Sequence, residues 1–108
     1  MHKFSGKIIK GDGYGRKLGF PTLNLDTRND IGAPSGVYAG SVSLDGKEYQ
    51  AAIVVNPTGK VEAHILNYNA DIYGKDVILE TKKFIRKYRD FNNERELINQ
   101  ISADIKLC

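Results

Sequence analysis

The sequence of 108 residues has no tryptophan, one methionine and one cysteine. The cysteine, Cys108, is the last residue, which excludes a disulfide-stabilised scaffold and a cysteine-ligated zinc site within this sequence. No apolar run approaches the roughly 20 residues that a transmembrane helix needs, and the segment Met1–Gly6 lacks the apolar core of a secretory signal. These absences predict a globular protein in a reducing, cytoplasmic setting.

The composition supports one modest hydrophobic core, because 41% of the residues are hydrophobic and 27% are charged. This length is close to the usual size of one domain, so we expect a single domain over residues 1–108. The net charge of +3 suits a polyphosphate ligand and equally suits RNA. We interpret the most basic run, Lys82–Arg89, as a solvated strand end, with a phosphate-binding or nucleic-acid patch as the alternative.

Short stretches with strand signals, separated by turn residues, fill the first two-thirds of the chain. They span Lys7–Lys10, Thr22–Asp26, Val37–Leu44, Lys47–Val55, Val61–Leu66 and Asp76–Ile85. Between the third and fourth stretches, Asp45-Gly46 predicts a type I′ hairpin. Because no helices alternate with these strands, the pattern predicts a small antiparallel barrel, while an open sandwich fits the same pattern.

Near the end of the chain the period changes, and apolar residues recur at helical spacing at Leu97, Ile98, Ile101 and Ile105. This spacing predicts one amphipathic helix over Glu94–Leu107, packed on the sheet. Asn93 occupies the N-cap position, and Glu96 follows three residues later, which resembles a capping box.

A glycine-rich segment between Gly11 and Gly19 has four glycines in nine residues. Such a backbone needs positive φ angles or a close approach to a neighbour. Neither a Walker lysine nor a following helix is present, so the segment matches no phosphate-binding fingerprint and connects strand to strand. It is either a loop that covers a ligand or a hairpin without one.

Thr22 and Asn24 lie two residues apart on one predicted strand, so their side chains share a face while Leu23 and Leu25 face the core. A hydroxyl and an amide oxygen are hard ligands that suit Mg²⁺, which takes few protein ligands when phosphates supply the rest. The alternative is that both residues form part of a polar outer face.

Glu62 lies on the predicted strand face opposite Val61, Ala63 and Ile65. A carboxylate there can accept a proton from an attacking hydroxyl, although an exposed strand glutamate is more often solubilising. His64 shares that face and is interpreted as a structural or surface histidine.

Five segments, in order and spacing, resemble the motifs of the riboflavin kinase family, and the resemblance runs from Phe4 to Asp104. The segments are Gly11–Asn24, which contains the Pro-Thr-x-Asn motif, then Gly36–Ala39, Val61–Leu66, Asp71–Lys75, and Ile85–Phe91 with the last helix. The resemblance implies a six-stranded antiparallel Greek-key barrel with one C-terminal helix. It also implies transfer of the γ-phosphate of Mg-ATP to the 5′-hydroxyl of riboflavin, which gives FMN and ADP.

The resemblance implies a role for individual residues. Thr22 and Asn24 would bind Mg²⁺, and Glu62 would be the catalytic base. The flavin would contact Arg86 and Phe91. ATP would be bound by Gly11, Gly13, Gly15, Lys17, Gly19, Pro21, Thr22, Asn24, Asn67 and Tyr73.

The sequence departs from the family pattern at a short Asn56–Gly59 loop, at Asn67, which replaces a common Asp, and at Tyr88, which replaces a common Glu. The adenylyltransferase domain of bacterial bifunctional FAD synthetases is not part of this sequence, so FAD synthesis is not expected from it.

Riboflavin and ATP are the expected partners, without nucleic acid, membrane or an obligate protein partner. Two alternatives are a flavin-binding barrel without activity and a small RNA-binding barrel, for which the six tyrosines are scattered rather than interleaved with basic residues.

Overall fold

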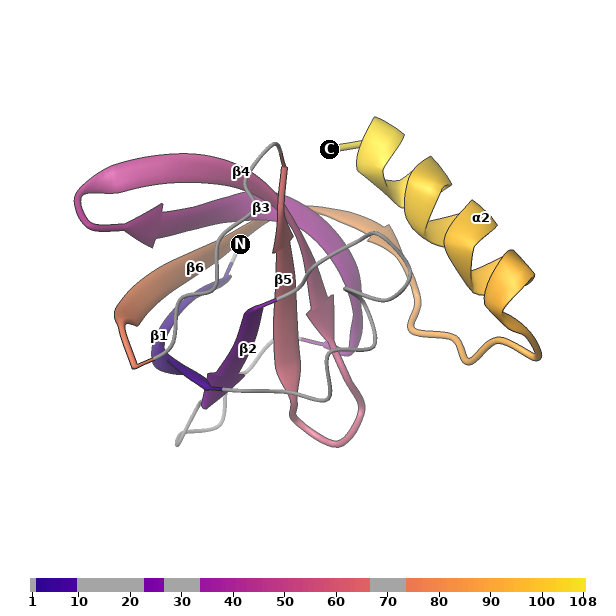
Figure 1. Ribbon diagram of the computed structural model, residues 1–108, viewed down its shortest axis with the longest axis horizontal. Helices are drawn as coiled ribbons and strands as arrows, with labels where there is room; N and C mark the ends of the chain where they lie inside the picture. The colour runs from indigo at the N-terminus through magenta and orange to yellow at the C-terminus, as the bar shows by residue number, and fades with distance from the viewer. Residues whose placement is uncertain (1, 10–22, 27–33, 67–73) are drawn as a thin grey trace.

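In the computed structural model, which describes residues 2–9, 23–26, 34–66 and 74–108, six strands form a closed barrel (Figure 1). The strands in chain order are β1 (His2–Ile9), β2 (Leu23–Asp26), β3 (Gly36–Leu44), β4 (Lys47–Val55), β5 (Val61–Ile65) and β6 (Asp76–Arg86). Around the barrel the order is β1-β2-β5-β4-β3-β6, and every neighbouring pair is antiparallel. After the β3-β4-β5 meander, β6 returns to pair with β3, which is a Greek-key connection. The expected six-stranded Greek-key barrel is confirmed.

The barrel interior is filled by side chains that alternate along the strands. On β5, Val61, Ala63 and Ile65 are buried in the core, whereas Glu62 and His64 point to the outer face and are only partly buried. Among the described residues, the core cluster consists of Ile8, Leu25, Tyr38, Val42, Leu44, Ala51, Ile53, Val55, Val61, Ala63, Ile65, Val77 and Leu79. The period of two therefore holds as predicted, and it decides which polar residues remain available for a site.

The β3–β4 hairpin turns at Asp45 and Gly46, whose φ angles are 51° and 79°. Positive φ at both central residues is the signature of a type I′ turn, as the Asp-Gly pair predicted. The predicted boundaries differ most from the structure at the first strand, which begins at His2 rather than at Lys7. Ser5 and Gly6 give no strand pattern, but they pair with Ile78 and Val77 on β6, so tertiary pairing makes them part of the strand.

The helix α2 (Glu94–Lys106) stands beside the barrel, and the segment 87–93 leads to it from β6 (Figure 1). The Asn93 side chain accepts a hydrogen bond of 2.9 Å from the backbone N–H of Glu96, which confirms the N-cap. The apolar residues Leu97, Ile98, Ile101 and Ile105 are half-buried, as expected for one face of an amphipathic helix. Within the described ranges, no helix has the length and apolar character needed to cross a bilayer.

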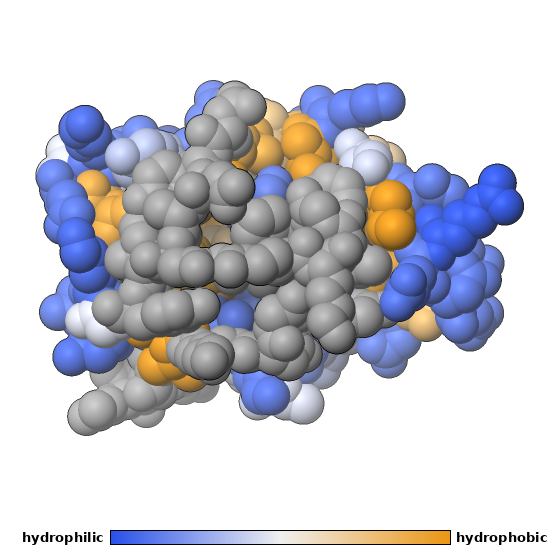
Figure 2. Space-filling model, viewed as in Figure 1, coloured by the Kyte–Doolittle hydropathy of each residue, from blue (hydrophilic) through white to orange (hydrophobic). Residues whose placement is uncertain are grey.

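Figure 2 shows hydrophobic residues at several separate places on the visible face. Among the described residues, the large hydrophobic side chains that are exposed are Ile9, Ile78, Phe84 and Leu107.

Candidate active site

The closure of the barrel places Asn24 on β2 directly opposite Glu62 on β5. Directly paired residues of antiparallel strands point to the same face, with their Cβ atoms about 4.5–5.5 Å apart. Both side chains are partly buried on the outer face, because Leu25 and Ala63 beside them fill the core. The fold thus brings together an amide and a carboxylate that the sequence singles out only separately.

Apolar residues flank the Asn24–Glu62 pair along the same row of the barrel. Ile9 on β1 pairs with Asn24, and Val54 on β4 pairs with Glu62. His64 lies two residues further along β5 and shares the outer face. A partly accessible carboxylate between apolar neighbours can meet a bound hydroxyl and accept its proton.

Tyr88 lies near this pair, although it belongs to the segment between β6 and α2. Its hydroxyl oxygen accepts a hydrogen bond of 3.0 Å from Asn56 Nδ2 at the end of β4. Burial raises the pKa of the Tyr88 phenol, and the negative charges of Asp90 and Glu62 raise it further. The sequence indicated Tyr88 only as a departure from the family motif, because its position depends on two loops that are distant in the chain.

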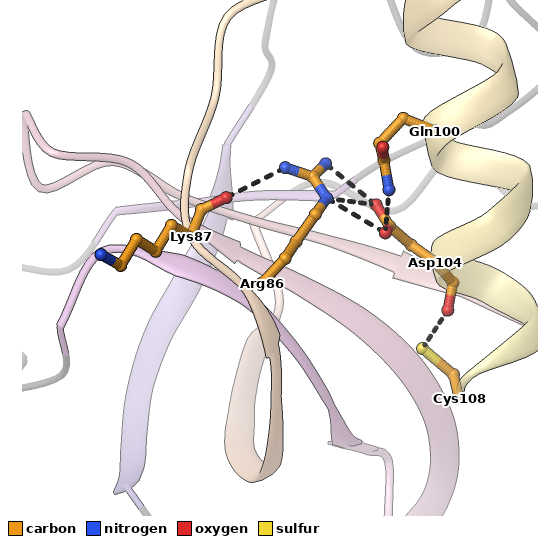
Figure 3. A network of polar contacts seen from close by, with 5 residues as sticks. All are labelled: Arg86, Lys87, Gln100, Asp104 and Cys108. Atoms are coloured by element: carbon orange, nitrogen blue, oxygen red, sulfur yellow. Dashed lines mark hydrogen bonds and ion pairs between the residues drawn. The ribbon is translucent and has the colours of Figure 1, made fainter.

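Arg86, the last residue of β6, binds Asp104 of α2 through a forked ion pair (Figure 3). Arg86 Nε lies 3.0 and 3.1 Å from the two Asp104 carboxylate oxygens, and Arg86 Nη2 lies 2.9 Å from one of them. Gln100 Nε2 donates to the same carboxylate at 3.0 Å, and Arg86 Nη1 donates to the Lys87 carbonyl at 3.1 Å. Asp104 is only 4% exposed, so this pair ties the helix to the barrel.

Phe91 also lies in this region, close to two guanidinium groups. The Cζ atoms of Arg86 and Arg89 are 5.5 and 4.9 Å from the centroid of its ring. These distances are within the usual range of cation–π contacts. The structure thus brings Arg86 and Phe91 together, while their contact with a flavin remains a prediction.

Most of the residues expected to bind ATP fall outside the described part of the chain. They are Gly11, Gly13, Gly15, Lys17, Gly19, Pro21, Thr22, Asn67 and Tyr73. Among the described residues, no group of three or more His, Cys, Asp or Glu side chains could hold a metal ion. Of the predicted site residues, the described strands place the Asn24 amide and the Glu62 carboxylate, both hard oxygen donors, side by side.

A cavity of about 410 Å³ opens elsewhere on the barrel and does not include the Asn24–Glu62 pair. Its lining residues are His2, Pro34, Tyr38, Thr81, Lys82, Lys83 and Phe84. The Tyr38 hydroxyl donates to the Pro34 carbonyl at 2.6 Å, and Thr81 Oγ1 is bonded to the His2 backbone. Because these polar groups are already paired and none was a predicted site residue, we assign this cavity no part in the site.

Two curated proteins of similar sequence carry the same description. The bifunctional riboflavin kinase/FMN adenylyltransferase of Bacillus subtilis is 36% identical over 92% of this chain and 35% of its own length. The protein of the same description from Escherichia coli K12 is 34% identical over 93% of this chain and 34% of its own length. The chain therefore spans about a third of the length of the curated relatives it matches.

Solved structures share the fold. A crystal structure described as a macrolide-efflux protein from Streptococcus pneumoniae superposes with a TM-score of 0.86 and 29% identity, over 97% of this chain and 37% of that one. Riboflavin kinase from Trypanosoma brucei superposes with a TM-score of 0.67 and 24% identity, over 99% of this chain and 78% of that one. The Flavokinase family model, described as riboflavin kinase, matches residues 1–108. The chain belongs to the riboflavin kinase family.

Proposed function

We propose that residues 1–108 form a riboflavin kinase domain, which transfers the γ-phosphate of ATP to the 5′-hydroxyl of riboflavin. The observation that carries this proposal is the placement of Asn24 directly opposite Glu62 in a chain of this family. The family relationship favours this function over a flavin-binding barrel without activity and over an RNA-binding barrel. Riboflavin and ATP are the substrates, FMN and ADP the products, and the cytoplasm is the proposed setting.

Glu62 is the proposed catalytic base. In the transfer, the 5′-hydroxyl oxygen of riboflavin forms a bond to the γ-phosphorus while the bond from that phosphorus to the β–γ bridging oxygen breaks. ADP leaves with the electron pair of the broken bond, and Glu62 accepts the proton of the hydroxyl. Phosphoryl transfer asks a protein mainly for alignment, which a side chain fixed on a barrel strand can provide.

Asn24, together with Thr22, is the proposed Mg²⁺ ligand. The donor chemistry fits, because an amide oxygen is a hard ligand and Mg²⁺ usually takes only one or two protein groups beside phosphates and water. When bound, Mg²⁺ would supply neutralisation of charge on the phosphate oxygens. Asn24 stands beside Glu62, so the end of the nucleotide that reacts would lie next to the base.

FMN formation tests this proposal. The purified chain is mixed with riboflavin and ATP, with and without Mg²⁺, and FMN is followed by chromatography. FMN that forms only with the metal is the expected result. Flavin fluorescence that is quenched without FMN formation would favour the non-catalytic flavin barrel, and salt-dependent RNA binding without flavin binding would favour the RNA-binding barrel.

A further inference from the structure

Asn56 at the end of β4 is held in a tight turn that uses its oxygens. Its backbone N–H donates to the Lys60 carbonyl at 2.8 Å, and its own carbonyl accepts from the Gly59 N–H at 2.9 Å. Its side-chain Oδ1 accepts from the backbone N–H and the hydroxyl of Thr58, at 2.9 and 2.8 Å. The side-chain amide nitrogen therefore points away from the turn, where it donates to the Tyr88 hydroxyl oxygen at 3.0 Å.

This hydrogen bond joins two segments that are 32 residues apart, the β4–β5 turn and the segment between β6 and α2. Because the Tyr88 oxygen accepts from Asn56, its proton is directed elsewhere. Burial, the charge and hydrogen bond of Asp90, and the charge of Glu62 raise the pKa of this phenol, whereas the hydrogen bond from Asn56 lowers it, so Asp90 and Asn56 both contact the hydroxyl. The orientation of Tyr88 is thus set from both sides.

The two residues lie on one side of Glu62, and Asn24 lies on the other. Val54 on β4 pairs with Glu62, and Asn56 is the first residue after β4, so Asn56 and the Tyr88 that it contacts lie on the β4 side of β5. Asn24 lies on β2, the strand on the other side of β5 from β4. If the phosphate donor binds next to Asn24, on the β2 side of Glu62, the hydroxyl-bearing acceptor would bind on the β4 side, where Tyr88 lies.

We propose that the Asn56–Tyr88 hydrogen bond is a bridge that holds residues 87–93 on the acceptor side of Glu62, and that Tyr88 is a positioning residue for the acceptor substrate. The inference rests on the proposed kinase function and extends it. An acceptor that is an aromatic ring carrying a hydroxylated chain suits a partly buried phenol, whose ring is apolar and whose hydroxyl is polar. The bridge should therefore govern affinity for riboflavin rather than for ATP.

The test compares Tyr88→Phe, Asn56→Ala and the double variant in steady-state assays of FMN formation. Both single variants remove the Asn56–Tyr88 bond, so each should raise the KM for riboflavin by at least about five-fold, the equivalent of one typical neutral hydrogen bond. Asn56→Ala also removes the two bonds from Thr58, and Tyr88→Phe also removes the bond to Asp90. The double variant should raise this KM by clearly less than the product of the two single effects, because the shared Asn56–Tyr88 bond is lost only once. The KM for ATP and the kcat should stay within about two-fold of the wild type.

Thr58→Ala is the matched control. It removes a hydroxyl that contacts Asn56 Oδ1 within the same turn but leaves the Asn56–Tyr88 bond intact, so its KM for riboflavin should equal that of the wild type. An unchanged KM in Tyr88→Phe, an equal rise in the KM for ATP, or additive losses in the double variant would overturn the bridge. A wild-type chain that forms no FMN would instead overturn the proposed function, and this inference with it.

Discussion

The ion pair between Arg86 and Asp104 predicts a large loss of stability when one partner is removed. The Asp104→Asn variant leaves the guanidinium without its counter-charge at a site where the two side chains are 21% and 5% exposed. Removing one partner of a buried ion pair typically costs about 3–5 kcal/mol. Because one-fifth of the Arg86 side chain is exposed, the freed guanidinium can recover some hydration, so we expect a loss of free energy of unfolding near the lower value, about 3 kcal/mol.

Thermal unfolding followed by far-ultraviolet circular dichroism measures this loss. In a domain of this size, each kcal/mol shifts the Tm by roughly 4–8 °C, so Asp104→Asn should unfold about 12–24 °C below the wild type. Glu48→Gln is the control, since it breaks the Lys82–Glu48 pair of 2.9 Å between side chains that are 47% and 61% exposed. Exposed pairs contribute little, so the control should shift the Tm far less.

A wild-type Tm in Asp104→Asn, or a shift equal to that of Glu48→Gln, would refute this reasoning. The double variant Arg86→Met/Asp104→Leu gives a second check, because replacing both partners by apolar groups removes the uncompensated charge. It should recover most of the lost stability. If the double variant is as unstable as Asp104→Asn, the loss has another cause than the unpaired guanidinium.

Three further predictions concern the barrel, the helix cap and the cysteine. In Gly40→Ala, the added Cβ atom would collide with the Glu80 carbonyl oxygen and contact the Ile53 side chain. The midpoint of urea unfolding should therefore fall by an amount equivalent to about 1–3 kcal/mol. An unchanged midpoint would contradict the close approach of β3 and β6. Asn93→Ala removes the 2.9 Å bond to the Glu96 N–H and should cost about 1 kcal/mol of stability, whereas Asn93→Ser should cost little; equal stabilities of the two variants would argue against the cap. Burial, and after it the charge of Asp104, raises the pKa of the Cys108 thiol. Because the thiolate then forms only at higher pH, the rate of alkylation of Cys108 by iodoacetamide should rise at a higher pH than the rate for free cysteine. A rise at or below the pH found for free cysteine would contradict this prediction.

Local sequence patterns predicted the elements whose signals are local. The alternation of Val61, Ala63 and Ile65 with polar residues gave the inner and outer faces of β5, and Asp45-Gly46 gave the hairpin turn. Asn93 gave the start of the helix. In each case a neighbouring residue or the backbone angle at that position decides the structure, so a short window of sequence is sufficient.

Features that depend on distant pairing could not be predicted in this way. The segment His2–Gly6 of β1 is a strand because it pairs with β6, not because of its own residues, among which are Ser5 and Gly6. The adjacency of Asn24 and Glu62 requires β2 to pair with β5, which no local pattern specifies. The binding of Arg86 by Asp104 likewise depends on where the helix meets the barrel, so the guanidinium could be predicted only as a functional residue and not as a structural one.

The central claim is that the Glu62 carboxylate, beside Asn24, accepts the proton of the attacking hydroxyl. The most direct measurement is the rate of FMN formation by Glu62→Gln, compared with the wild type at saturating ATP and riboflavin. General-base catalysis contributes about 10²–10⁴-fold, so we predict a fall in kcat of that size while the Tm and the quenching of riboflavin fluorescence are retained. A Glu62→Gln variant that forms FMN at the wild-type rate would contradict the claim and remove Glu62 from the mechanism.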